Sequence, residues 1–469
     1  MRRLAIDQPH GLAQIGPTRS NYGLASEWGN ALDIVRSVRL RLASPRPLDR
    51  RLLVLVGVFL ITRLVMAFLA GNPLLYTRSG PAVTYDVYLY REWGSQIVAS
   101  GGMPYSEVPI EYPPGILPFV LLPAWLLHQL QVPFLLSFVL LMTVVDGLGL
   151  TGLRRLGRWW GSDLGAWLWV VALPLLGPIV LLRLDLVPAV ATIWCVERAA
   201  AGRWTAAGAF LGIGCLAKLY PVFLLPAAIV IAPQRRRLVQ AALIVGLLGI
   251  IPLISSIRAM TTNVVGYHAD RGIQIESLWG NFLLLADRLG HDTTVGKAFG
   301  SDEITAGMAA TAKTLSTVLS LAVIGFVIWV ARRSHRQGDP RYLAATFFAT
   351  LALLLVTGRV LSPQYLIWLV ALAAGAAAAH VVERRTVAVL LTAILLTHIE
   401  FPFRFFDLLS GEPVSLAVLT VRNVCLVALA LFAVRAWLAM SGTWSAGGSH
   451  KREPPVAMGR PLTERTNYR

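Results

Sequence analysis

Residues 84–115 read TYDVYLYREWGSQIVASGGMPYSEVPIEYPPG and form a polar segment directly after the first long apolar run of the chain. If residues 86–99 are helical, the apolar side chains of Tyr90, Trp93 and Ile97 share one face. Such a helix is too short and too polar to cross a bilayer, so we expect it to lie on the membrane surface. Carboxylates and aromatic rings held there suggest an active site at the lipid interface.

Composition places this segment in a helical membrane protein. Of the 469 residues, 56% are hydrophobic and only 14% are charged, which excludes an ordinary soluble globular protein. The formal net charge of +17 does not indicate a nucleic-acid partner, because the bases fall in short clusters between apolar runs. These clusters are typical of cytoplasmic loops under the positive-inside rule. They are Arg154, Arg155 and Arg158; Arg198 and Arg203; Arg235 to Arg237; Arg332, Arg333 and Arg336; and Arg384 and Arg385.

Hydropathy predicts an all-α polytopic domain over residues 51–440 with about twelve spans, each needing about twenty apolar residues. We expect residues 1–50 and 441–469 to be cytoplasmic tails, partly disordered. The spans that the sequence delimits are about residues 52–70, 132–153, 163–182, 186–200, 238–257, 311–331 and 342–357. Three further spans follow residue 358. The three cysteines lie in apolar runs and are predicted to be packing residues.

Two apolar runs depart from simple spans. Residues 115–129 contain Pro118 and Pro123, and we expect a shallow or re-entrant helix there. The run over residues 206–230 is interrupted by Lys218-Leu-Tyr220-Pro221. A broken helix is tolerated only where it lines protein or water, so we expect its halves to meet at a polar pocket reached from outside.

The two long loops predicted to be external are rich in acids. Residues 71–114 carry two bases against four acids, and residues 258–310 carry four bases against six acids. This asymmetry supports an orientation with both termini in the cytoplasm. We expect the acids Asp287, Asp292, Asp302 and Glu303 to be solvated surface residues.

The topology gathers polar side chains on the external side. Ionisable residues near mid-membrane cost about 2.5–3.5 kcal/mol on insertion scales, so their presence at span ends around one pocket requires an explanation. An anionic, lipid-linked substrate held by Arg and Lys beside a carboxylate base provides one. The candidate residues are Asp86, Glu111, Arg183, Asp185, Lys218, Tyr220, His268, Arg271, Glu276, Arg359, Ser362, Gln364 and Tyr365.

Several candidates have an equally simple structural interpretation. Asp86 is as consistent with an N-cap of the following helix as with catalysis. Glu111 is consistent with a loop residue oriented by prolines, and Arg183 with a local ion pair to Asp185. Lys218 is harder to explain structurally, because a cytoplasmic anchor would lie on the other face; phosphate binding is the favoured hypothesis.

The ordered motifs D-x-Y-x-Y, G-G-x-P-Y, E-Y-P-P, R-x-D, A-K-L-Y-P, Y-H-x-D-R-G-x-Q-x-E-S and L-S-P-Q-Y-L-x-W resemble those of glycosyltransferase family 87. The resemblance runs from about residue 52 to 437. It implies a GT-C fold of the actinobacterial polyprenol-phosphate-mannose-dependent mannosyltransferase type. It also implies a large first external loop with membrane-parallel helices, whose acidic residue, here Asp86, is the general base.

The resemblance further implies inverting transfer of a sugar, with mannose as first choice, from a polyprenyl-phosphate donor to a glycolipid or lipoglycan acceptor outside the cell membrane. We assign the donor phosphate to Lys218, His268, Arg271 and Arg359. The sugar or acceptor is assigned to Glu111, Arg183, Asp185, Tyr220, Glu276, Ser362, Gln364 and Tyr365. We predict neither a metal nor another cofactor, although Asp185, Glu111 and Glu276 are cation ligands in principle. The motifs do not separate mannose from arabinofuranose.

Two other classes of function remain open from the sequence. One is a secondary transporter or lipid flippase with about twelve spans, although transporters place coupling residues near the midplane and show related halves. The other is a non-catalytic assembly partner. Substitution of Asp86 separates these classes, because only an enzyme should lose turnover.

Overall fold

A computed structural model describes residues 50–75, 80–305 and 307–442 of the chain. The described residues from Val58 onward belong to one compact unit, and the boundary of a separate unit falls at Gly57, within the first described helix. The predicted tails, residues 1–50 and 441–469, lie almost wholly outside the described residues, so their cytoplasmic assignment stays a prediction.

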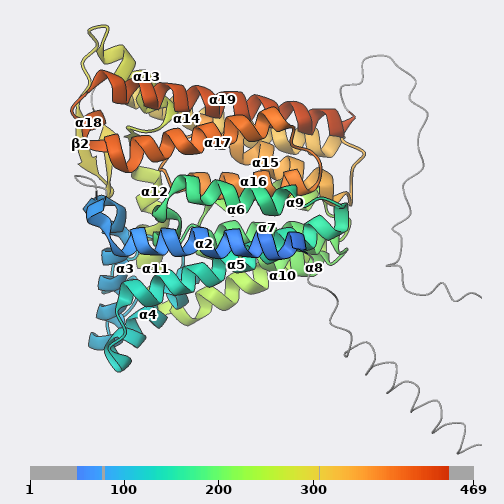
Figure 1. The fold of residues 1–469 in the computed structure, drawn as a ribbon, viewed down its shortest axis with the longest axis horizontal. Coiled ribbons are helices and arrows are strands. Elements are labelled where there is room, and N and C mark those ends of the chain that lie inside the picture. The colour runs from blue at the N-terminus through green and yellow to red at the C-terminus, as the bar shows by residue number, and fades with distance from the viewer. Residues whose placement is uncertain (1–49, 76–79, 306, 443–469) are drawn as a thin grey trace, which may run out of the picture. The chain divides into compact units, whose positions relative to one another are not determined.

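The described part of the chain is mainly helical (Figure 1). Up to residue 231 the elements are α2 (Arg50–Gly71), α3 (Gly80–Ser100), η2 (Pro114–Ile116), α4 (Leu117–Leu130), α5 (Phe134–Trp160), α6 (Leu164–Leu176), η3 (Pro178–Leu182), α7 (Leu186–Ala200), α8 (Trp204–Ala217), η4 (Tyr220–Leu224) and α9 (Leu225–Ile231).

The second half alternates long helices with one segment of short helices and strands. Its elements are α10 (Arg235–Ile250), η5 (Ile251–Ser256), α11 (Ile257–Met260), η6 (Thr261–Gly266), α12 (Tyr267–Asp270), β1 (Ile273–Gln274), α13 (Leu278–Asp287), β2 (Val295–Ala298), β3 (Ser301–Ile304), α14 (Ala309–Arg333), α15 (Pro340–Thr357), α16 (Tyr365–Ala378), α17 (Arg384–His398), η7 (Ile399–Arg404), α18 (Phe405–Leu409) and α19 (Pro413–Ser441).

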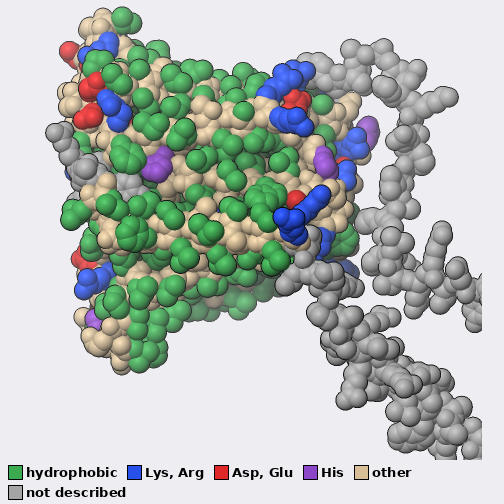
Figure 2. Space-filling view, viewed as in Figure 1, with side chains coloured by type: hydrophobic (Ala, Val, Ile, Leu, Met, Phe, Trp, Pro, Cys, Tyr) green, Lys and Arg blue, Asp and Glu red, His purple; other side chains and the backbone are tan. Residues whose placement is uncertain are grey.

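The polytopic class is confirmed. Within the described residues, seven helical segments are long and apolar enough to cross a membrane, and five shorter apolar helical segments accompany them. On the face shown in Figure 2, hydrophobic side chains cover the middle of the helices, and charged side chains gather toward both ends. An apolar band between charged ends suits a bilayer. The total of about twelve spans stays a prediction.

The core is built around α16. Its residues from Leu366 to Ala378 are all buried, and α16 packs against α6, α7 and α15. Small side chains allow these helices to approach closely: a Cβ at Gly165 of α6 would collide with the carbonyl of Ala374 in α16. Close packing of small residues is the usual way in which membrane helices associate.

The segment predicted to be the first external loop contains the expected amphipathic helix, but this helix starts earlier. The helix α3 begins at Gly80, so Asp86 lies inside it and is not its N-cap; that alternative is wrong. Tyr90 and Trp93 are buried while Tyr88 is exposed, as the helical pattern predicted. The predicted shallow helix is α4, whose 14 residues cover only about 21 Å at about 1.5 Å per residue.

The predicted break near residue 218 is also present. The helix α8 ends at Ala217, Lys218 has an extended backbone, and η4 begins at Tyr220 with Pro221 in its first turn. Proline lacks the N–H that a continuous helix would require at this point. The break therefore turns the Lys218 side chain into the protein interior, where it is buried.

The segment predicted to be the second external loop contains a small sheet that the sequence did not predict. Strands β1, β3 and β2 form an antiparallel sheet in that order, and Val295 pairs with Ile304. The hairpin between β2 and β3 turns at Phe299 and Gly300, both with positive φ. In Figure 1, β2 lies at the same end of the long helices as α3, α13 and α18.

Candidate active site

Asp86 is held by an arginine from a distant part of the chain. Arg183 Nε lies 2.9 Å from Asp86 Oδ2, and Arg183 also donates to the Val83 carbonyl at 3.1 Å. Arg183 is almost fully buried, whereas the Asp86 side chain is 23% exposed. The arrangement orients a carboxylate while leaving it reachable, which a general base requires.

Asp185 and Lys218 form a second, fully buried ion pair. Lys218 Nζ lies 2.8 Å from Asp185 Oδ1. The hypothesis of a local Arg183–Asp185 pair is therefore wrong, because these two residues point to different partners. In the short turn that joins η3 to α7, Arg183 reaches Asp86 and Asp185 reaches Lys218.

Three aromatic rings surround the Lys218 ammonium group. Its Nζ lies 4.9 Å from the ring centre of Tyr112, 5.4 Å from that of Tyr365 and 5.1 Å from that of Trp368. Tyr365 stacks on Trp368 with ring centres 4.0 Å apart. Such contacts stabilise a cation electrostatically and fix its position. Tyr112 and Trp368 lie within the E-Y-P-P and L-x-W motifs, but the sequence alone gave no reason to assign them to Lys218.

Glu111 directly precedes Tyr112, one of the three rings around Lys218. Burial raises the pKa of Glu111 above its ordinary value, a hydrogen bond with Tyr267 and the charge of Arg271 oppose that shift, and the charge of Asp86 adds to it. The two carboxyls are thus close enough to influence one another. A half-buried carboxyl with a raised pKa beside a second acid is a common feature of functional sites.

Arg271 brings positive charge to the same place, beside the His268 imidazole. The charges of Lys218, Arg271 and Arg359 all act on the His268 imidazole. The Arg271 guanidinium donates to Ser301 Oγ at 2.7 Å and lies 3.5 Å from Glu303 Oε1. Glu303 is buried, so its prediction as a solvated surface residue is wrong; the sheet places it against Arg271.

Arg359 is committed to backbone groups. Its guanidinium donates to the carbonyls of His268 at 2.9 Å and Ala269 at 3.0 Å, and to Thr317 Oγ1 at 3.2 Å. These bonds fix the segment that carries His268 and Arg271. The geometry therefore favours a positioning role for Arg359 over direct phosphate contact.

Glu276 and Ser362 meet through Gln274. The Gln274 amide donates to Glu276 Oε2 at 2.8 Å, and its oxygen accepts from Ser362 Oγ at 3.2 Å. Arg422 Nη2 donates to the Glu276 carbonyl at 2.9 Å. Glu276 is buried and interacts with buried Glu400. These contacts indicate that Glu276 supports the structure of the site.

Tyr220 and Gln364 are two further residues that the sequence assigned to the site. Tyr220 is buried, stacks on Trp368 at 4.3 Å between ring centres, and its hydroxyl lies 3.4 Å from Thr192 Oγ1. Gln364 precedes α16 and is half-buried. These positions indicate packing and orientation, and sugar contact stays a prediction for both.

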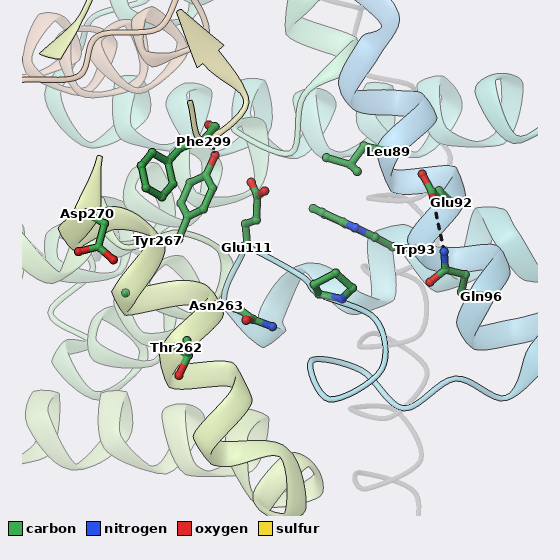
Figure 3. A pocket seen from close by; sticks show the side chains of 12 residues that line it. Leu89, Glu92, Trp93, Gln96, Glu111, Thr262, Asn263, Tyr267, Asp270 and Phe299 are labelled. Carbon is green, nitrogen blue, oxygen red and sulfur yellow. Dashed lines mark hydrogen bonds between the residues drawn. The ribbon is translucent and has the colours of Figure 1, made fainter. Parts of the chain in front are cut away.

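A cavity of about 520 Å³ opens beside Glu111, between α3 and the η6–α12 segment. Figure 3 shows Glu111 between Tyr267 on one side and Trp93 on the other, with Phe299 next to Tyr267. No group of three or more His, Cys, Asp or Glu residues within the described ranges is arranged to hold a metal ion. Metal-independent chemistry stays a prediction.

No curated protein sequence matches the chain. The crystal structure of ArnT from Cupriavidus metallidurans bound to undecaprenyl phosphate is similar at 14% identity, covering 82% of this chain and 77% of ArnT with a TM-score of 0.43. The sequence model of glycosyltransferase family 87 matches residues 111–363, more than half of the chain. Asp86 precedes the matched region, so its assignment depends on the ion pair with Arg183. The chain belongs to glycosyltransferase family 87.

Proposed function

We propose that this glycosyltransferase transfers mannose from a polyprenyl-phosphate donor to a glycolipid or lipoglycan acceptor on the external face of the cell membrane, with inversion at the anomeric carbon. Both termini then lie in the cytoplasm. The observation that supports this most directly is the reachable Asp86 carboxylate, oriented by Arg183 and close to several cationic side chains.

The chemistry needs one base and a stabilised leaving group. Asp86 accepts the proton of the acceptor hydroxyl while that oxygen attacks the anomeric carbon and the bond to the phosphate oxygen breaks. General base catalysis of this kind contributes roughly 10²–10⁴-fold. The phosphate departs without a proton, and fixed positive charges stabilise it.

We assign the departing phosphate to Lys218, His268 and Arg271. Lys218 is held in place by Asp185 and three rings, and Arg271 by Ser301 and Glu303, so neither needs to reorganise when charge develops. Arg359 holds the backbone of the His268 segment. Tyr365, half-buried beside Lys218, is assigned to the donor sugar.

The test presents purified protein in nanodiscs with radiolabelled polyprenyl-phosphate mannose and, separately, polyprenyl-phosphate arabinofuranose, each with a mixed glycolipid extract. We expect the mannose label to move to the acceptor. Transfer of arabinose alone would replace the donor assignment. Movement of neither label by folded protein would contradict the proposal and reopen transport or a non-catalytic assembly role.

A further inference from the structure

The cavity beside Glu111 has a lining that differs from the cationic group around Lys218. Its walls carry three carboxyls, from Glu92, Glu111 and Asp270, and two amides, from Gln96 and Asn263 (Figure 3). No Lys, Arg or His is among the described residues that line it. Carboxylates and amides beside aromatic rings match the hydroxyl groups and apolar ring faces of a sugar.

One lining residue has an unusual backbone. Phe299 occupies the first position of the β2–β3 turn with φ of 49°, and Gly300 follows at 65°. Two-residue turns with positive φ at both positions strongly prefer Asn or Gly at the first. A bulky residue there is an outlier that local packing must maintain.

The surroundings of Phe299 keep its ring at the cavity. The Tyr267 hydroxyl donates to the Phe299 carbonyl, and the two rings meet edge to face with centres 5.4 Å apart. The Phe299 side chain nevertheless remains 36% exposed. A disfavoured turn residue that leaves its ring accessible at a cavity lined by both aromatic rings and carboxyls indicates a ligand-binding surface.

We propose that this cavity binds the acceptor as an uncharged glycan end, with Phe299 and Tyr267 as the aromatic surface for a sugar ring. The inference rests on the proposed function and specifies the substrate class of the same site. Glu111 belongs to the cavity wall and its carboxyl interacts electrostatically with Asp86, so the cavity lies close to the proposed base.

Charge separates the two substrates. The donor phosphate meets Lys218, His268 and Arg271, whereas an acceptor in the cavity meets three carboxyls. A phosphate on the accepting sugar would face like charge, which excludes it more effectively than missing contacts do. The cavity therefore selects neutral hydroxyl-bearing ends and keeps the anionic donor out.

The experiment measures binding of a neutral alkyl oligomannoside, and of the same compound with a phosphate monoester on its terminal sugar, by calorimetry on full-length protein in nanodiscs. The decisive variant is Phe299→Asn, which suits the turn better and removes the ring. We expect its affinity for the neutral glycan to fall about tenfold, from the loss of aromatic contact, while its melting temperature is unchanged or higher. Phe299→Tyr should retain binding, and Leu289→Asn, at an exposed apolar residue outside the cavity lining, should match wild type.

The outcomes separate this inference from the proposed function. Unchanged glycan affinity in folded Phe299→Asn, or equal binding of the phosphorylated compound by wild type, would overturn the acceptor site. Release of mannose from the donor into water needs no acceptor, so it reports the donor half-reaction alone. Glycan binding that depends on Phe299 without any donor turnover would support the cavity and overturn the donor assignment.

Discussion

Arg183 Nε lies 2.9 Å from Asp86 Oδ2, and this ion pair joins α3 to the turn between η3 and α7. Arg183 is almost fully buried, whereas the Asp86 carboxylate that it holds remains partly exposed. A substrate can therefore approach Asp86 from the side opposite to Arg183. Arg183 thereby acts on the reaction through Asp86.

Arg183→Gln should lower both stability and kcat. We expect a loss of about 2–3 kcal/mol in unfolding free energy, below the roughly 3–5 kcal/mol typical of a fully buried pair, because Asp86 is 23% exposed. The measurement is denaturation in detergent together with transfer kinetics. Arg183→Lys should recover more stability than turnover, since an ammonium group lacks the planar geometry of a guanidinium. Wild-type kcat in folded Arg183→Gln would contradict the positioning role.

Lys218→Met should destabilise the protein strongly, by about 3–5 kcal/mol, because it leaves Asp185 buried without a partner. Adding Asp185→Asn should restore most of that stability. Donor KM measured in the folded double variant then isolates the phosphate contact, and we expect it to rise. A wild-type donor KM in that double variant would show that Lys218 only supports the structure.

The raised pKa of Glu111 predicts that the stability difference between wild type and Glu111→Gln depends on pH. Burial raises its pKa above the ordinary value of 4.5, so its contribution favours the folded state at low pH and is lost as the pH rises through the folded pKa. Glu111→Gln should therefore melt higher than wild type at neutral pH, and the two should converge below the ordinary pKa. Melting curves over pH check this. If Glu111→Gln melted below wild type at neutral pH and at the same temperature in acid, the prediction would be contradicted.

The buried cluster of Glu276, Glu400 and Arg422 predicts unequal effects of neutralisation. Burial and the neighbouring Glu400 raise the pKa of Glu276 well above its ordinary value. Glu276→Gln removes like-charge repulsion and still accepts from Gln274, so we expect unchanged or higher stability. Arg422→Leu removes the positive charge that faces Glu276 and Glu400 and should cost about 3–5 kcal/mol. Equal effects of the two variants in a denaturation series would contradict this account.

Local sequence predicted the elements that depend on hydropathy and on proline. The helix α3, the short helix α4 and the break at Lys218 were confirmed, because periodicity and a missing N–H act within one or two turns. The ordered motifs predicted glycosyltransferase family 87, and the match of the family model confirmed it.

The sequence did not predict which charges pair. Arg183 and Asp185 are close in sequence and were expected to bind each other, but each meets a partner brought by another helix. Glu303 was expected to be solvated, and a sheet with no clear alternating pattern buries it against Arg271. Pairing across the chain depends on tertiary packing, which no local pattern encodes.

The most direct test of the account is the transfer rate of Asp86→Asn. Wild type and Asp287→Asn are the controls, because Asp287 is an exposed acid at the end of α13. We expect kcat to fall at least about 100-fold, the lower end of general base catalysis, with folded protein and a donor KM close to wild type. Asp287→Asn should transfer at the wild-type rate. Near wild-type turnover by folded Asp86→Asn would show that another group takes the proton and would contradict the central claim.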